Sequence, residues 1–429
     1  MNGFFTSNKP LNLHTYLIMK NMEKLALFGG NPVRTKPFPN WPSFTGELKT
    51  QLINTMEKDS WGVGSNIIKE FEEKYAEFHD AKYGLSTSSG TTALWVCLKA
   101  AGVKAGDEVL IPPYTFIATG SAILMANAIP VFVDVDLETF NMDPAKLEAA
   151  ITDKTKVIMP VHIAGNPANM DAILQIANKH NIKVIEDAAQ AHGAEWNGKK
   201  VGALGLGGIF SFQTSKNLSA GEGGTIVSND KEFIEACFSY ANCGRVKGGE
   251  WYEHQYLGGN FRLNSMAASL LLAQLNTIDK DMDLRDKNRK ILDDAISEID
   301  GLTITKMYPQ TTRSANHLYL LRYDKAKFNG IPREKFFRAM QAEGVYTYAG
   351  YAPLYRERLF TVDSKEYPWL AGINYKDMNF PVTEKLCMEE AVWLIQNHLL
   401  GTKNDINDII RAFYKVTTVM KEEPNLFSK

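Results

Sequence analysis

The chain has 429 residues, of which 45% are apolar and 22% charged, as in an ordinary globular protein of two or three domains. Its 47 basic and 49 acidic residues give a net charge of −2 without basic clusters, so neither nucleic acid nor an anionic membrane is an expected partner. No apolar run reaches the length of a membrane span, and the four cysteines lack the spacing of a zinc or redox motif. These features predict a cytoplasmic protein with buried, reduced cysteines.

The first 24 residues (1–24) are expected to form a loose N-terminal extension, since they lack the basic start, apolar core and cleavage site of a signal peptide. Apolar residues at helical spacing next predict an amphipathic surface helix over 66–81. Four short β-branched runs then indicate buried parallel strands, and two helical stretches lie among them. The strand runs are 108–112, 130–135, 156–161 and 183–187, and the helical stretches are 143–151 and 169–180.

Two further strands, over 207–213 and 223–230, enclose a glycine-rich turn that contains Lys216. Because strands and helices alternate along this part of the chain, the fold class is predicted to be α/β, with a doubly wound and mostly parallel sheet. The pattern then becomes mostly helical from about 230 to 295.

A second structural unit is expected after the helical region. The residue pattern predicts a strand over 317–324 and helices over 332–344 and 405–420. The chain is therefore divided into a large domain, 25–290, and a smaller C-terminal α+β domain, 291–429.

Reactive side chains follow several of the predicted strands. In an open α/β sheet, ligands bind beyond the carboxyl ends of the strands. Asp187 ends one strand, Lys216 follows a second, and Phe116 follows a third. The segment 86–94, STSSGTTAL, leads into a helix whose free N–H groups would attract an anion, although serine and threonine are also ordinary helix caps.

Together these groups match the needs of pyridoxal 5′-phosphate. Lys216 would form a Schiff base with the aldehyde, and a desolvated site would keep part of its amine unprotonated. Asp187 would pair with the pyridine nitrogen, and the ring of Phe116 would lie against the face of the cofactor. Ser211 and the turn Ser89–Thr91 would hold the phosphate.

Other interpretations remain for the same residues. Lys216 on a surface turn, Asp187 as a helix cap and Phe116 as core packing are the competing structural roles. No metal site is expected, because His162 and the other nearby histidines lack ligand spacing. A dinucleotide site is also disfavoured, because no G-x-G-x-x-G follows the first strand.

Three motifs carry a resemblance to a known family. The stretches VIEDAAQAHGA, FSFQTSKNLSAGEGG and GGNFRLNSMAASLLLAQL resemble the DegT/DnrJ/EryC1/StrS family, and the similarity extends over about residues 25–420. This family consists of pyridoxal-phosphate-dependent aminotransferases of fold type I that act in sugar and cyclitol biosynthesis. The resemblance therefore implies that fold, that cofactor and an enzyme of the transaminase class.

The resemblance also implies roles for individual residues. Lys216 is similar to the Schiff-base lysine and Asp187 to the partner of the pyridine nitrogen. Gly90, Thr91 and Ser211 match phosphate contacts, Phe116 matches the stacking aromatic, and Gln190 matches a side chain that flanks the ring. Asn260 matches an asparagine that reaches the cofactor phosphate of the neighbouring subunit, which implies a homodimer with shared active sites.

The expected reaction is a ping-pong transamination in which Lys216 is the general base. The donor would be L-glutamine or L-glutamate, and the acceptor a keto-cyclitol or keto-sugar. The segment 160–173 resembles the branch with scyllo-inosose and 2-deoxy-scyllo-inosose aminotransferases and aminohydroxybenzoate synthases. The segment 215–218, SKNL, is closer to enzymes of nucleotide-linked keto-sugars, so that acceptor stays open as an alternative.

Rival functions are a sugar dehydratase of the same family, a non-catalytic binding or sensor protein, and a nicotinamide oxidoreductase. The dehydratases have histidine in place of the lysine, and a non-catalytic relative would lack the lysine or the aspartate. Lys216 and Asp187 are both present, which favours the aminotransferase. Further candidates for contact with the acceptor are His162, Arg245, Tyr319 and Tyr351.

Overall fold

The computed structural model describes residues 24–361, 363 and 365–428. The predicted N-terminal extension, 1–24, therefore lies outside the described residues except for Lys24.

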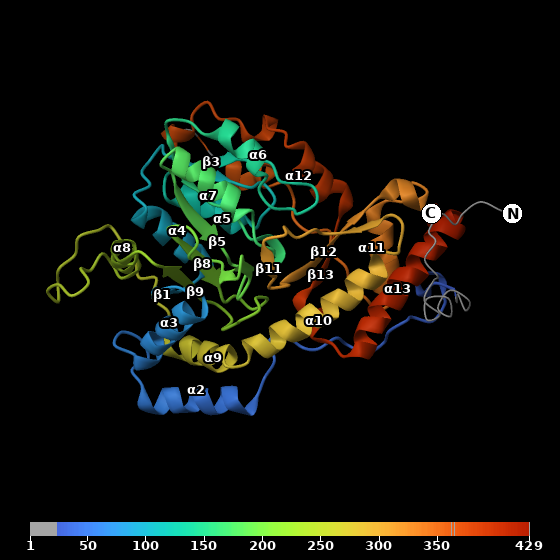
Figure 1. The fold of residues 1–429 in the computed structure, drawn as a ribbon, viewed down its shortest axis with the longest axis horizontal. Coiled ribbons are helices and arrows are strands. Elements are labelled where there is room, and N and C mark those ends of the chain that lie inside the picture. The colour runs from blue at the N-terminus through green and yellow to red at the C-terminus, as the bar shows by residue number, and fades with distance from the viewer. Residues whose placement is uncertain (1–23, 362, 364, 429) are drawn as a thin grey trace.

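A seven-stranded sheet with the order β1-β9-β8-β5-β4-β2-β3 forms the centre of the larger part of the molecule (Figure 1). Neighbouring strands from β8 to β3 are parallel, whereas β9 is antiparallel to both of its neighbours. The predicted class, α/β with a mostly parallel sheet, is confirmed. The strands are β1 Tyr83–Thr87, β2 Glu108–Ile111, β3 Ile129–Phe132, β4 Thr155–Ile158, β5 Lys183–Asp187, β8 Gly207–Ser211 and β9 Gly224–Ser228.

Helices cover both faces of this sheet because its central strands are apolar on both sides. Ile185 and Ile209 pack into one core, and their neighbours Val184 and Phe210 pack into the other. The first core includes side chains of α4 Gly90–Ala100, α5 Ile117–Met125 and α8 Lys231–Ala241, and the second those of α3 Asn66–Phe78, α7 Met170–Lys179 and α9 Ser265–Leu275. None of the helices among the described residues is both long and apolar enough to cross a bilayer.

Several elements differ from the prediction. The strand run 130–135 continues only to Phe132 in β3, and the helical stretch 143–151 divides into α6 Pro144–Leu147 and a 3₁₀ turn. The mostly helical region is interrupted, because 242–264 contains no helix. Strand β1 was not predicted, since its YGLST sequence is too polar for the pattern of a buried strand.

A second, three-stranded antiparallel sheet is built from β10 Leu302–Ile304, β12 Leu318–Tyr323 and β13 Ala391–Ile395. It packs with α11 Arg333–Ala342 and α13 Lys403–Glu422 around a separate apolar core. The long helix α10, Ile278–Ile296, runs from the large sheet to this smaller part, so the domain limit predicted at residue 290 falls inside a continuous helix (Figure 1).

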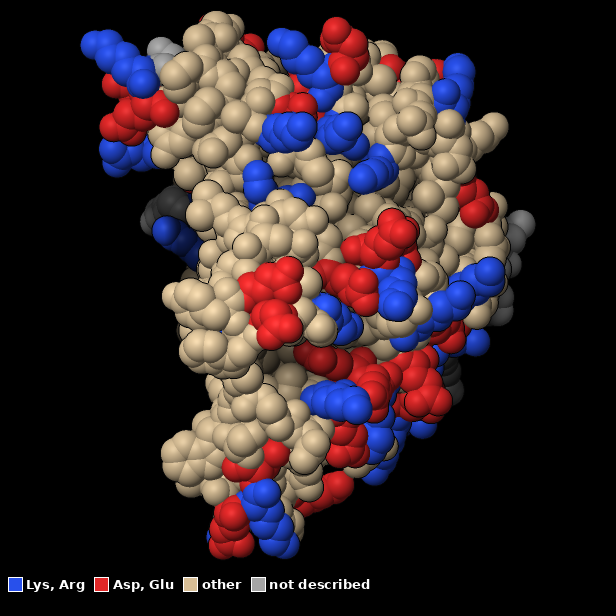
Figure 2. All heavy atoms as spheres, turned by 90° about the vertical axis from the view of Figure 1, so that its left-hand side faces the viewer, with Lys and Arg blue, Asp and Glu red and all other residues tan. Residues whose placement is uncertain are grey.

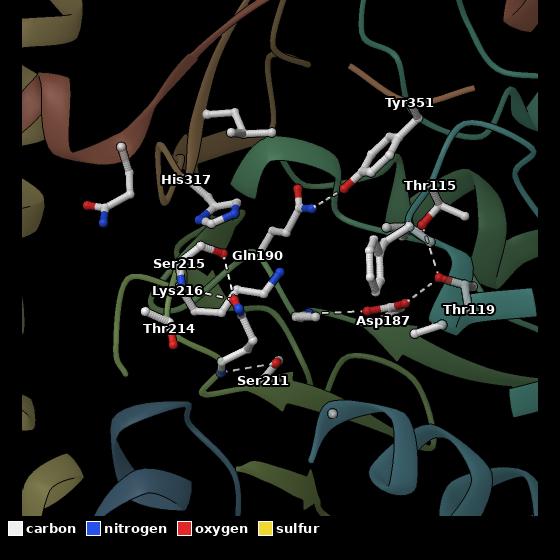
Figure 3. Close-up of a pocket in the computed structure, with 18 of the residues that line it drawn as sticks. Thr115, Thr119, Asp187, Gln190, Ser211, Thr214, Ser215, Lys216, His317 and Tyr351 are labelled. Carbon is white, nitrogen blue, oxygen red and sulfur yellow. Dashed lines mark hydrogen bonds between the residues drawn. The ribbon is translucent and has the colours of Figure 1, made fainter. Parts of the chain in front are cut away.

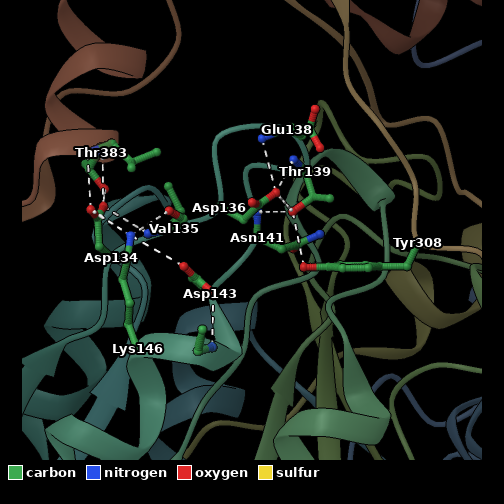
Figure 4. A network of polar contacts seen from close by, with 12 residues as sticks. Asp134, Val135, Asp136, Glu138, Thr139, Asn141, Asp143, Lys146, Tyr308 and Thr383 are labelled. Carbon is green, nitrogen blue, oxygen red and sulfur yellow. Dashed lines mark hydrogen bonds and ion pairs between the residues drawn. The ribbon is translucent and has the colours of Figure 1, made fainter.

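Polar contacts around Asp134 join the two parts of the molecule (Figure 4). Its carboxylate accepts hydrogen bonds from the backbone N–H groups of Val382 and Thr383 at 3.1 and 3.0 Å, and from the Thr383 hydroxyl at 2.8 Å. Lys146 lies 3.3 Å from the same carboxylate. Asp134, just past β3, therefore caps the first turn of α12, Pro381–Lys385, which precedes β13. This contact holds the smaller sheet against the loops of the larger one.

Candidate active site

A cavity of about 1020 Å³ lies beyond the carboxyl ends of β5 and β8 (Figure 3). The start of α4 and the segment before α5 line it on the side of the large sheet. The ends of β12 and β13 line it from the smaller part, through His317, Trp393 and Gln396. The cavity is thus closed by two walls from distant parts of the chain.

Most of the predicted site residues line this single cavity. Those that do are Ser89, Gly90, Thr91, Phe116, Asp187, Gln190, Ser211 and Lys216. Asn260 does not line it; this residue is exposed on the segment 242–264, where it forms an antiparallel bridge with Asn242. The large sheet therefore brings the predicted residues together, except for the one assigned to a neighbouring subunit.

Asp187 is buried at the end of β5, with both carboxylate oxygens hydrogen-bonded. The Thr119 hydroxyl donates to Oδ2 at 2.8 Å, and the backbone N–H of Ala189 donates to Oδ1 at 3.2 Å. Burial raises the pKa of Asp187, while these hydrogen bonds and the charge of Lys216 oppose that shift. A carboxylate held this way can stabilise a cation that enters the cavity.

Lys216 lies in the turn between β8 and β9, and its side chain faces the cavity with Asp187 and Gln190 (Figure 3). The turn is held by the Trp41 indole N–H, which donates to the Lys216 carbonyl at 2.9 Å. Burial lowers the pKa of the Lys216 amine to about 8, although the charge of Asp187 acts in the opposite direction. In the part of the chain that is described, the amine has no hydrogen-bond or ion-pair partner, so it is available for covalent chemistry.

The start of α4 forms an anion site opposite Ser211. Ser89 caps the helix by accepting from the Thr92 N–H at 3.1 Å, and the Thr92 hydroxyl accepts from the Ser89 N–H at 3.0 Å. The N–H groups of Gly90 and Thr91 have no intrahelical partner because they belong to the first turn. A side chain at Gly90 would come within 2.8 Å of Ser211 Cβ, so glycine keeps this corner open. The geometry suits a phosphate group.

Gln190 crosses from the large-sheet wall to the smaller part. Its Oε1 accepts from the Ala164 N–H at 2.6 Å, and its Nε2 donates to the Tyr351 hydroxyl at 2.8 Å. Phe116 precedes α5 and is 56% exposed, with its ring centroid 6.5 Å from that of Tyr351. Its exposed ring can lie against a planar ligand.

His162 has a structural role. It donates from Nε2 to Glu186 at 3.0 Å and accepts at Nδ1 from the Ala168 N–H at 3.0 Å, away from the cavity. Of the other candidates for contact with an acceptor, Tyr351 lines the cavity, whereas Tyr319 lies in the core of the smaller part and Arg245 lies near Trp251. No group of three or more His, Cys, Asp or Glu side chains among the described residues could hold a metal ion.

Sequence reasoning missed many of the lining residues, among them Trp41, Thr119, His317 and Gln396. Thr119 lies three residues past Phe116, one helical turn away, so its proximity to the site could have been inferred. His317 begins the strand predicted over 317–324, at the end that faces the cavity. Trp41 and Gln396 lie far along the chain from the motifs, and no local signal identifies them.

Comparisons with known proteins give matches over most of the chain. Residues 43–413 match the sequence model of the DegT/DnrJ/EryC1/StrS aminotransferase family. The chain is 38% identical over 406 residues to a putative L-glutamine:3-amino-2,3-dideoxy-scyllo-inosose aminotransferase of Streptoalloteichus tenebrarius, covering 92% of this chain and 97% of the relative. It is 34% identical over 415 residues to the L-glutamine:2-deoxy-scyllo-inosose aminotransferase of Streptomyces lividus, with coverage of 92% and 97%. The crystal structure of 3-amino-5-hydroxybenzoic acid synthase matches with a TM-score of 0.80 at 31% identity, covering 90% of this chain and 100% of that one.

Proposed function

The chain belongs to the DegT/DnrJ/EryC1/StrS aminotransferase family, and we propose that it uses pyridoxal phosphate to transfer the amino group of L-glutamine to a keto-cyclitol. The observation that carries the proposal is the meeting, in one cavity, of a buried carboxylate, Asp187, and the amine of Lys216, which has no partner among the described residues. Asp187 ends β5 and Lys216 lies in the turn after β8, and the start of α4, which can bind an anion, lines the same cavity.

The residues of the cavity fit this cofactor. The free N–H groups of Gly90 and Thr91 would hold the phosphate together with Ser211. The corner has room for it because residue 90 is glycine and has no Cβ. Asp187 would accept from the protonated pyridine nitrogen, and Phe116 would cover the ring. Lys216 would hold the aldehyde carbon covalently.

Asp187 and Lys216 would hold and transfer the protons of the amino-group transfer. When bound, pyridoxal phosphate supplies a ring that withdraws electrons from the Cα of an amino acid. Asp187 would keep a proton on the pyridine nitrogen. The amino group of the donor would displace Lys216 from the aldehyde carbon. Lys216, then a free amine, would take the proton from the donor's Cα and return it at that aldehyde carbon, because an amine with a pKa of about 8 suits a general base near neutral pH. Overall the donor becomes a 2-oxo acid, the ketone becomes an amine, and no oxidant is consumed.

The names of the relatives support L-glutamine as donor and a keto-cyclitol as acceptor. The two aminotransferases with 38% and 34% identity are both named for L-glutamine and a scyllo-inosose derivative, and each aligns over 97% of its length. A nucleotide-linked keto-sugar is the less favoured acceptor.

We also propose a homodimer in which Asn260 of one protomer completes the cavity of its partner. Asn260 is exposed and lies outside the cavity of its own chain. It follows the segment 245–257, where Trp251, Tyr252 and Leu257 are 77%, 76% and 93% exposed. Clustered exposed apolar side chains mark interaction surfaces, and wide areas of this face carry no charged side chain (Figure 2).

Absorption spectroscopy and separate half-reactions test this function. Purified protein reconstituted with pyridoxal phosphate should be yellow, and L-glutamine should bleach it; the Lys216→Ala variant should lack the yellow band and turn over no substrate. Adding 2-deoxy-scyllo-inosose to the bleached wild-type protein should restore the colour. A nucleotide keto-sugar that restores it while cyclitols do not would refute the proposed acceptor.

A further inference from the structure

Two polar side chains of the smaller sheet face the cavity side by side. His317 directly precedes β12, and Gln396 directly follows β13. Leu318 is paired with Ile395 in the antiparallel register, so His317 and Gln396 leave the sheet as neighbours. Both line the cavity, and His317 lies beside the turn that carries Lys216.

Buried contacts fix which end of Gln396 faces the cavity. Its Oε1 accepts from Arg285 Nε at 3.1 Å and from Arg285 Nη2 at 2.6 Å. An arginine only donates hydrogen bonds, so the amide oxygen must point towards it. The Nε2 group therefore points away from Arg285, and among the described residues it has no acceptor.

Arg285 is a fully buried cation that depends on this contact. Within the described part of the chain Gln396 is the hydrogen-bond partner of its guanidinium, and its Nη1 has no hydrogen-bond partner. Burial lowers the pKa of Arg285 to about 10, which leaves it charged at neutral pH. Burial removes the guanidinium from water, and the amide oxygen of Gln396 is its main replacement partner. The charge of Arg285 therefore holds that amide strongly.

A similar chain of contacts fixes His317. Asn217 Nδ2 donates to the Ala315 carbonyl at 2.7 Å, so its Oδ1 is the atom that lies 3.0 Å from His317 Nδ1. Nδ1 must therefore carry the proton, and Nε2 is left with a lone pair and no partner among the described residues. Burial, with the nearby charges of Lys216 and Arg285, lowers the pKa of His317 and keeps the ring neutral.

We propose that Gln396 and His317 form an oriented donor–acceptor pair that binds a ring hydroxyl of the amino acceptor, and that Arg285 is the positioning residue for Gln396. This inference rests on the proposed function. A hydroxyl can accept from Gln396 Nε2 and donate to His317 Nε2, whereas the carboxylate of an amino donor can only accept and would oppose the histidine lone pair. The pair therefore favours a neutral polar group over a carboxylate, and separate half-reactions distinguish a ring hydroxyl of the acceptor from the side-chain amide of L-glutamine.

The variant Gln396→Glu tests the pair with little change of volume. The new carboxylate can still accept from Arg285, so the fold is retained, but the N–H donor towards the cavity is lost. We expect kcat/KM of the half-reaction with 2-deoxy-scyllo-inosose to fall about 10-fold or more, mainly through KM, while the L-glutamine half-reaction stays within about 2-fold. Gln175→Glu, the same change on the exposed face of α7, is the matched control and should alter neither half-reaction.

A second variant, Arg285→Lys, tests the positioning role. Lysine keeps the buried charge but loses the two-pronged contact, so the amide is free to turn, and the same loss confined to the acceptor half-reaction is expected. Equal losses in both half-reactions, or a larger loss with L-glutamine, would overturn the inference. Unchanged acceptor kinetics in Gln396→Glu would overturn the inference and leave the proposed function standing. If L-glutamine bleaches the wild-type protein but no cyclitol restores its colour, the proposed acceptor fails, and the inference fails with it.

Discussion

The amine of Lys216 and the carboxylate of Asp187 share one cavity, and burial disfavours the charged form of each. Burial lowers the pKa of the amine and raises that of the acid. The charge of each group opposes the shift in the pKa of the other. The result is an amine with a pKa of about 8, of which an appreciable part is unprotonated near neutral pH. This coupling is local enough to be tested by single substitutions.

Replacing Asp187 by asparagine should lower the pKa of Lys216 below about 8, because the carboxylate is the group that favours the protonated amine. The cofactor-free protein can be labelled with a neutral amine reagent at a series of pH values, and the modification of Lys216 followed by mass spectrometry. The labelling rate should rise with pH around a midpoint near 8 in the wild type and around a lower midpoint in Asp187→Asn. An unchanged or higher midpoint would show that the two side chains do not interact.

Gly90→Ala should weaken binding of pyridoxal phosphate by about 10-fold or more, which is about 1.4 kcal/mol. The new methyl group would lie within 2.8 Å of Ser211 Cβ, in the corner proposed for the phosphate. Gly46→Ala is the matched control, since Gly46 is also the first residue of a helix, α2 Gly46–Lys58, and has open space around it. Fluorescence titration measures both affinities, and equal affinities would place the phosphate elsewhere.

At the scale of elements, α12 and the loop after β3 hold the two walls of the cavity together. Asp134 accepts from the Thr383 hydroxyl and from two backbone N–H groups at the start of α12. The residues that follow α12 lead into β13, which ends at Ile395, next to Gln396. The position of the cavity wall formed by the smaller sheet therefore depends on Asp134, which caps α12 from about 250 residues earlier in the chain.

Asp134→Ala should destabilise the protein by about 2 kcal/mol, because it leaves the N–H and hydroxyl groups of Thr383 buried without an acceptor. Asp153→Ala, at an exposed position, is the control and should have little effect. Denaturant unfolding measures both changes. Equal stability of the two variants would mean that the cap contributes nothing to holding the smaller part in place.

At the scale of the whole molecule, the proposed homodimer makes each active site depend on two chains. The segment 242–264 places the exposed Asn260 outside the cavity of its own chain, so in the proposed dimer Asn260 would serve the cavity of the partner. The exposed apolar side chains nearby give that protomer a surface to cover.

Mixing two inactive variants tests this arrangement. Lys216→Ala and Asn260→Ala should each lose most of their activity, but mixed dimers formed by refolding them together should contain one intact site. Activity should return to about a quarter of the wild-type value at equal concentrations, because half of the dimers are mixed and each has one working site of two. Activity no higher than the sum of the separate variants would show that Asn260 acts within its own chain.

The α/β class and the grouping of the predicted residues on the large-sheet side of the cavity could be predicted from sequence because both depend on local order. Strand β5 has the predicted bounds, 183–187, and the ends of β5 and β8 place Asp187 and Lys216 at one edge of the sheet. The antiparallel direction of β9 and the helix-free segment 242–264 could not be predicted in this way. Neighbour choice in a sheet and the course of a long loop depend on contacts that local periodicity does not encode.

What the sequence by itself determined is therefore the set of parallel strands in the central sheet and the position of Lys216 and Asp187 at its edge, since strand periodicity and the residues after each strand end are short-range properties. Only the tertiary structure decided which polar atoms the smaller sheet presents to the cavity. Arg285 and Gln396 are 111 residues apart, and Asn217 and His317 are 100 apart, yet their contacts set which polar atoms face the cavity. The physical reason is that an amide or an imidazole presents either a donor or an acceptor according to its buried partner, and that partner is chosen by the packing of distant segments.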